Sequence, residues 1–272
     1  MTENLIQMTI FSGYLWSAFR ILGHTKSGEN PTTKNYRSIT QLILLVVLIS
    51  HLFLLINEIK GGAETKFGLD TAILVIFWMA TSFYWLFSFF YKLEILYSLV
   101  VFCSAAILPI TTILPSNNLF SGSYPSIFGI HLVLSMMAYS IFTIAGLHTL
   151  LMAITQKHLN SGKIPHYIQS LPPLLTLEKI LFQMIFVGIF LLSLSLITGM
   201  FFLEQTTGQV IEFNHKIVFG WLSWIIFICL ITGRMLLGWR GRVAINCTII
   251  GYTFLLLSYI GTRLVGEIIL AT

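Results

Sequence analysis

The stretch Gly199–Lys216, with the sequence GMFFLEQTTGQVIEFNHK, connects two long hydrophobic segments and decides how the chain is organised. Its polar centre around Gly208 is typical of a loop, because glycine and short polar residues interrupt regular structure. Each hydrophobic segment is about 20 residues long or longer, which is enough for a helix to cross a bilayer. The second segment begins at His215. The stretch therefore predicts two membrane helices, with a histidine at the mouth of the second.

The composition of the whole chain is that of a membrane protein. Of its 272 residues, 56% are hydrophobic and 9% are charged, and the mean hydropathy is +0.88. Soluble domains carry about 25% charged residues. Because hydrocarbon requires every backbone N–H and C=O to be paired within the chain, we predict an all-α polytopic bundle. The net charge of +5 reflects basic residues at the rim of the membrane domain. The sequence contains no basic and aromatic patch that would indicate nucleic-acid binding.

Eight hydrophobic spans, separated by turn residues, make up the predicted fold. They run roughly over residues 5–22, 38–57, 69–90, 95–114, 126–154, 177–203, 215–237 and 243–265. The break at Tyr91–Glu94 is the weakest, and the combined length of its two spans favours a tight hairpin over one bent helix. No linker or low-complexity tract divides the chain, so we predict a single integral membrane domain over residues 1–272.

The basic residues predict the orientation of the spans. Eleven of the fifteen lie in odd-numbered loops or at adjoining helix ends: Arg20, Lys26, Lys34, Arg37, Lys92, Lys157, Lys163, Lys179, Arg234, Arg240 and Arg242. Lys60, Lys66, Lys216 and Arg263 lie on the other side. Since cytoplasmic loops are enriched in Lys and Arg, both termini are expected outside, and Arg240 and Arg242 are interpreted as orientation anchors. The first span resembles an anchor more than a cleaved signal, because no basic region precedes it.

Three histidines are predicted near the outer face. His51 and His131 each lie about six residues inside a span, and His215 stands at the mouth of the seventh. An ionisable group at such depth is costly and usually faces a partner, so two of these imidazoles could hold a haem iron or another metal. The alternative for each is a neutral ring bonded to a hydroxyl or carbonyl. His148 lies roughly 25 Å from His131 along the same helix, too far to share an iron, and we predict a structural hydrogen bond for it.

Four blocks of sequence carry a resemblance to a known family. They are His131–Tyr139 (HLVLSMMAY), Leu171–Glu178 (LPPLLTLE), Gly199–Lys216 followed by Trp221 and Trp224, and Gly238–Arg242 (GWRGR). Over residues 126–265 the chain resembles the cytochrome c assembly (CcsA/CcmC-like, haem-handling) membrane protein superfamily, in particular its HemX/YpjD-like branch. The first 125 residues resemble it by topology only.

The resemblance implies a haem-binding protein of the bacterial plasma membrane, the inner membrane in a Gram-negative host. Such a protein would move or present haem for cytochrome c maturation, with other maturation proteins or an apocytochrome as partners beside the lipid bilayer. In that superfamily a histidine at the position of His131 is an external haem ligand, and the loop corresponding to Gly199–Lys216 contacts haem. Relatives carry tryptophans in that loop, where this chain carries Phe201, Phe202 and Phe213.

The predicted haem site follows from the chemistry of the ring, which is flat and apolar and carries an iron and two carboxylates. We predict His131 and His215 as axial ligands of the haem iron, with His51 as a substitute or a second site. The other predicted site residues are the aromatic wall Trp221, Trp224 and Phe213, and Lys216 and Arg263 as partners of the propionates. The haem is expected to be non-covalent and b-type, because the sequence has no CxxCH motif.

Two other functions are compatible with the sequence. A transporter of a divalent metal or small solute would suit a helical bundle with membrane histidines, although cation transport usually needs carboxylates at mid-span, and the spans have none there. A non-catalytic membrane regulator of haem synthesis is the other alternative. An enzyme is not expected, because no catalytic triad, carboxylate pair or phosphate-binding glycine loop is present.

Overall fold

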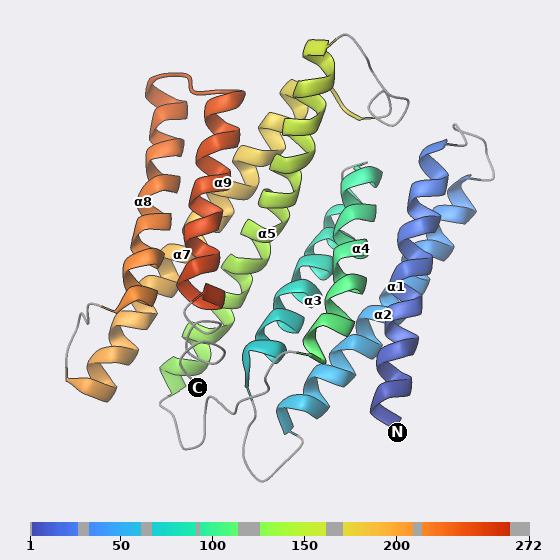
Figure 1. Cartoon of the computed structure of the whole chain (residues 1–272), viewed down its shortest axis with the longest axis horizontal. Helices are drawn as coiled ribbons and strands as arrows, with labels where there is room; N and C mark the ends of the chain where they lie inside the picture. The colour runs from blue at the N-terminus through green and yellow to red at the C-terminus, as the bar shows by residue number, and fades with distance from the viewer. Residues whose placement is uncertain are drawn as a thin grey trace. The chain divides into compact units, whose positions relative to one another are not determined.

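A computed structural model of the chain describes residues 2–26, 33–60, 67–90, 93–113, 126–161, 171–208 and 214–261. These residues form the helices of Figure 1: α1 (Thr2–Lys26), α2 (Thr33–Lys60), α3 (Leu69–Phe87), α4 (Glu94–Thr111), α5 (Ser126–Ser161), α7 (Leu174–Thr207), α8 (His215–Leu236), α9 (Arg242–Leu256) and the short π-helix η1 (Leu257–Gly261). In the described part of the chain, seven helical segments are long and apolar enough to cross a membrane, and α1 is not among them. The all-α polytopic fold is confirmed.

The helix boundaries lie within five residues of the predicted spans where both are described, except that α5 continues to Ser161, seven residues beyond the predicted end of its span. At the weakest break, α3 ends at Phe87, α4 begins at Glu94, and the two helices pack against each other, which confirms the hairpin. α7 ends at Thr207, and its C-cap Gly208 has a φ of +71°, in the left-handed region that glycine adopts without strain. The polar centre of the stretch Gly199–Lys216 therefore ends a helix, as expected. The sidedness of the termini stays a prediction.

Contacts divide the chain into two compact units. Unit 1 comprises Met1–Ser121 with His158–Pro172, and unit 2 comprises Gly122–Lys157 with Pro173–Thr272. In unit 1 the contacts close a ring, because α1 packs against α2 and α4, and α3 also packs against α2 and α4. In unit 2, α8 packs against α7, α9 and η1. The prediction of a single membrane domain stays a prediction.

Close packing of aromatic rings on glycines holds the middle of unit 2. Phe142 of α5 and Phe227 of α8 stack with ring centroids 4.1 Å apart, and both are fully buried. A Cβ atom on Gly188 would lie 2.8 Å from the Phe142 ring, and one on Gly251 would lie 2.9 Å from the Phe227 ring. Small residues let helices approach closely in membranes, where packing drives association. The two glycines therefore set the spacing of α7 and α9 from these rings.

Polar side chains inside the units donate to backbone carbonyls of neighbouring helices. In unit 1, Trp78 Nε1 donates to the Leu48 carbonyl at 2.9 Å, and Ser98 Oγ donates to the Ala18 carbonyl at 3.0 Å. In unit 2, His148 Nε2 donates to the Leu177 carbonyl at 2.8 Å, which confirms the structural hydrogen bond predicted for this histidine. These bonds satisfy groups that are costly to leave unpaired in apolar surroundings.

The glycine contacts predict a stability difference between two matched substitutions. Gly251→Ala should lower the free energy of unfolding by about 1–3 kcal/mol, because the new methyl group overpacks a fully buried ring. Gly129→Ala on α5 should be neutral or slightly stabilising, because no atom lies within 4 Å of the added Cβ. Thermal unfolding in one detergent, followed by circular dichroism, compares the two variants. Equal midpoints would contradict the packing role of Gly251.

Candidate functional site

The imidazole of His131 on α5 is held by a backbone carbonyl of α7. Its Nδ1 lies 2.9 Å from the carbonyl oxygen of Ser195. A carbonyl oxygen only accepts hydrogen bonds, so Nδ1 carries the hydrogen and, in the neutral ring, Nε2 keeps its lone pair. Metal-binding histidines are commonly oriented in this way, with one ring nitrogen donating to a carbonyl and the other facing the metal. The contact therefore fixes the tautomer of the neutral ring, with the lone pair on Nε2.

Hydroxyl groups and a glycine surround the same ring. Ser135 Oγ lies 2.7 Å from Ser195 Oγ and 3.5 Å from His131 Nε2, and Thr198 Oγ1 lies 3.4 Å from His131 Nδ1. A Cβ atom on Gly199 would lie 3.0 Å from Cε1 of the imidazole. The glycine thus leaves space for the ring. Gly199 was expected at the start of the stretch Gly199–Lys216. Its contact with His131 could not be predicted, because the sequence does not show which side chain packs against a glycine.

His215 and Lys216 begin α8, and both side chains are exposed. The charge of Lys216 is near enough to the His131 imidazole to interact with it electrostatically. The Lys216 ammonium also lies 5.6 Å from the centre of the Tyr259 ring, and its carbonyl accepts a hydrogen bond from Ser258 Oγ at 2.7 Å. The start of α8 therefore belongs to the neighbourhood of His131.

His51 lies in unit 1, on α2. It is fully buried, and its Nδ1 forms a hydrogen bond of 2.9 Å with the hydroxyl of Tyr14 on α1. Its Nε2 has no hydrogen-bond partner among the described residues. His131 belongs to unit 2, so each histidine is described within its own unit. Two further predicted site residues, Phe213 and Arg263, lie outside the described residues.

Two aromatic pairs of unit 2 involve side chains of α5, α7 and α8. Trp221 and Trp224 on α8 meet edge to face with centroids 5.6 Å apart, and Trp224 Nε1 donates to Ser193 Oγ of α7 at 2.8 Å. Phe128 and Phe202 contact each other at 4.9 Å between centroids. Phe128 precedes His131 by three residues, and neighbours at that spacing share a helix face. Phe128 was not among the predicted site residues, although its spacing from His131 could have indicated it.

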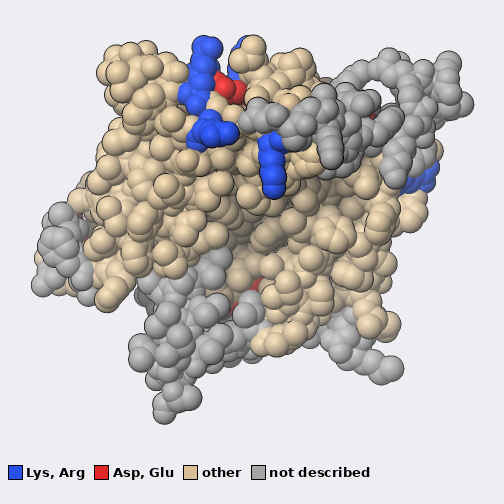
Figure 2. All heavy atoms as spheres, turned by 45° about the horizontal axis from the view of Figure 1, so that its top comes forward, with Lys and Arg blue, Asp and Glu red and all other residues tan. Residues whose placement is uncertain are grey.

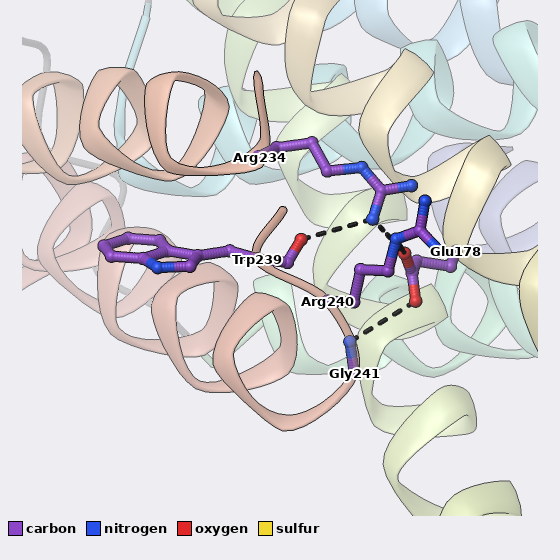
Figure 3. A network of polar contacts seen from close by, with 5 residues as sticks. All are labelled: Glu178, Arg234, Trp239, Arg240 and Gly241. Carbon is purple, nitrogen blue, oxygen red and sulfur yellow. Dashed lines mark hydrogen bonds and ion pairs between the residues drawn. The ribbon is translucent and has the colours of Figure 1, made fainter. Parts of the chain in front are cut away.

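A second polar network lies at the end of unit 2 where α7 begins and α8 ends (Figure 3). The buried carboxylate of Glu178 pairs with Arg234 and lies 3.8 Å from Nε of Arg240, and it accepts the Gly241 N–H at 3.3 Å. Arg234 also donates to the Trp239 carbonyl at 3.2 Å. Arg240, interpreted from sequence as an orientation anchor, is therefore also an ion-pair partner.

This network joins two blocks that carried the family resemblance, because Glu178 ends the block Leu171–Glu178 and Arg240 lies within Gly238–Arg242. The α8–α9 turn needs backbone angles that glycine adopts most easily, since Gly238 and Gly241 have φ of +67° and +54°. The Trp239 ring closes over Gly233, where a Cβ atom would lie 2.3 Å from it. Among the described residues, no group of three or more His, Cys, Asp or Glu side chains could hold a metal ion.

Comparison with known proteins identifies the family. The family described as "Cytochrome C assembly protein" matches residues 36–270. The chain therefore belongs to the cytochrome c assembly protein family, and the match includes α2, α3 and α4, which the sequence resemblance had covered by topology only.

Individual relatives agree with this family. The inner membrane protein YpjD of Escherichia coli (strain K12) is 32% identical over 140 residues, 52% of each chain. An uncharacterised 28.8 kDa protein of Azospirillum brasilense is 27% identical over 150 residues, 55% of each chain. The cytochrome c biogenesis protein CcsA of Synechocystis is 26% identical over 92 residues, 34% of this chain and 28% of that one. The chain spans about half the length of the curated relatives it matches first.

Removing the charge of Glu178 should destabilise unit 2. Glu178→Gln leaves Arg234, which is 26% exposed, without its counter-charge. Losing one partner of a buried pair costs about 3–5 kcal/mol, and the partial exposure of Arg234 reduces the expected loss to roughly 1–3 kcal/mol. Glu204→Gln, at an exposed position on the same helix, is the matched control. Thermal unfolding of both variants measures the difference, and a Glu178→Gln midpoint equal to that of the control would refute the role of the network.

Proposed function

We propose that this protein binds b-type haem non-covalently through His131 and handles haem in cytochrome c assembly. Membership of the family supports the assembly role at the coarse level. The observation that carries the haem proposal is the fixed His131 ring, whose Nδ1–H is bonded to the Ser195 carbonyl. Neutral imidazole is a common axial ligand of haem iron. Bound haem would supply the iron and the apolar macrocycle, and the protein residues would orient it.

The residues around His131 fit such a group. Gly199 leaves the space that an oriented imidazole needs. Trp221 and Trp224 on α8, with Phe128 on α5 and Phe202 on α7, offer apolar ring surface, and an apolar shell controls solvent access to haem. Lys216 supplies a cation near the imidazole, and charge-assisted hydrogen bonds to a propionate are among the strongest in proteins.

The second axial ligand in this proposal is His215. It directly precedes Lys216 at the start of α8, and Lys216 interacts electrostatically with His131. His51 remains the substitute or the ligand of a second site, which its buried Nε2 without a described partner supports. Phe213 and Arg263 remain proposed wall and propionate partners.

The place of action in this proposal is the plasma membrane, the inner membrane of a Gram-negative cell. Support comes from the apolar helices and from the name of the related inner membrane protein. Its partners would be the lipid bilayer, other cytochrome c maturation proteins and an apocytochrome that receives haem. The related CcsA proteins are named for cytochrome c biogenesis.

Substitution of His131 tests the haem proposal directly. The full chain is purified with haem supplied, and its absorption spectrum is recorded. We expect a Soret band that falls close to background in His131→Ala, because the oriented ligand is lost, and that is kept in His158→Ala near the other end of α5. Comparing His215→Ala with His51→Ala identifies the second ligand, since only the true ligand alters the spectrum of the bound haem. Wild-type intensity and ligation in His131→Ala would exclude His131 from the site.

A smaller change tests the orientation of the ring. Gly199→Ala places a methyl group about 3.0 Å from Cε1 of His131, so the imidazole must shift. Changes around a metal ligand typically weaken binding by about 10- to 100-fold, and we expect the lower end of this range. Haem titration of Gly199→Ala, with Gly129→Ala as control, measures the effect. Equal haem affinity in the two variants would show that the contact does not position the ligand.

A further inference from the structure

The two ends of unit 2 differ in charge in the part of the chain that the structure describes. The end where α7 and α9 begin and α5 and α8 end carries Lys157, Lys179, Arg234, Arg240 and Arg242 against the single carboxylate of Glu178, a net charge of +5 − 1 = +4. The opposite end carries Lys216 and Glu204, which cancel. The haem site proposed above lies at this neutral end, so the basic end is unused by it.

Four of the basic side chains at this end are exposed. They are Lys157, Lys179, Arg240 and Arg242, and we call them the basic face. Arg240 is 63% exposed although it faces Glu178. Gly241 lies beside Gln156 at the end of α5, since a Cβ atom there would be 3.7 Å from Gln156 Nε2. The α8–α9 turn, the start of α7 and the end of α5 therefore meet at one place.

The Glu178 network gives this face a fixed frame. Glu178 neutralises Arg234 and holds the Gly241 N–H, which anchors the turn between Arg240 and Arg242. In Figure 2 the blue atoms of Lys and Arg gather around the red carboxylate atoms at the top of the view. Lys157, Lys179 and Arg242 have no hydrogen bond or ion pair with other described residues. Their charges are therefore available to an anion.

Exposed apolar side chains lie beside these charges. Leu175 is 70% exposed on the first turn of α7, and Met235, Leu236 and Leu237 are 70–78% exposed at the end of α8. A free phosphate ion would make no use of such groups. A phospholipid would, because its acyl chains contact apolar side chains while basic side chains extend to its phosphate. Basic pockets between helix ends bind anionic headgroups in this way.

We propose that the basic face binds the headgroup of an anionic phospholipid. Arg240 and Arg242 offer planar guanidinium groups that match phosphate oxygens in pairs, and Lys157 and Lys179 add point charges. The apolar side chains at the ends of α7 and α8 contact the acyl chains. This inference is independent of the haem proposal, because it uses none of the residues of that site.

Lipid binding to the full chain tests this proposal. The protein is purified in detergent and titrated with phosphatidylglycerol or phosphatidylcholine, and bound lipid is counted by native mass spectrometry. We expect a preference for phosphatidylglycerol in the wild type. The double variant Lys179→Gln/Arg242→Gln should weaken phosphatidylglycerol binding by about five-fold for each charge removed, with phosphatidylcholine unchanged.

Controls separate this site from general charge effects and from folding. Lys60→Gln/Lys66→Gln removes as many charges from unit 1 and none from the basic face, and it should keep the preference. Lys179→Arg/Arg242→Lys keeps the charge and should also keep it. Millimolar inorganic phosphate should not displace the lipid. An unchanged preference in Lys179→Gln/Arg242→Gln, an equal loss in Lys60→Gln/Lys66→Gln, or displacement by phosphate would each overturn the proposal.

Discussion

Polar side chains of this protein donate to backbone carbonyls of neighbouring helices, because hydrocarbon offers no other acceptor. Trp78 and Trp85 do so in unit 1, and His131 and His148 do so in unit 2. Each bond ties two helices together and leaves the carbonyl's own helix intact, since a carbonyl oxygen has two lone pairs. At His131 the same constraint selects the tautomer of the ring. A requirement of membrane folding thus also decides which ring nitrogen of His131 carries the hydrogen.

The Glu178 network obeys the same constraint with charged groups. A buried carboxylate is costly alone, and here it is compensated by two guanidinium groups and a backbone N–H. The groups that contact Glu178 come from the end of α8 and from the following turn. One side chain of α7 therefore fixes the position of the α8–α9 turn. The turn residues Gly238 and Gly241 allow the chain to bring its N–H inward. The Glu178 network therefore determines both the fold of the α8–α9 turn and the arrangement of charges around it.

Hydrophobic length and turn residues were enough to predict the helices, including the hairpin near Tyr91–Glu94, because a membrane helix has a fixed minimum length. The family could be predicted from the blocks at His131, Leu171, Gly199 and Gly238. The contact between His131 and the Ser195 carbonyl could not be predicted. Every residue has a carbonyl, and the sequence does not show which carbonyl lies next to the His131 ring. Glu178 and Arg234 are 56 positions apart, and their pairing depends on tertiary packing. The predicted roles of Phe213 and Arg263 stay predictions.

The stacked rings of Phe142 and Phe227, seated against Gly188 and Gly251, clamp unit 2 at mid-length. Closely packed interiors resist deformation. The helices of unit 2 should therefore move least near these rings and more easily at their ends. The end of unit 2 that contains Glu178 is held by ion pairs, whereas the end that contains His131 is held by hydrogen bonds between neutral groups and by an aromatic contact. Charge-assisted bonds are roughly twice as strong as neutral ones, so the helices should separate more readily at the end of unit 2 that bears His131 than at the end that bears Glu178.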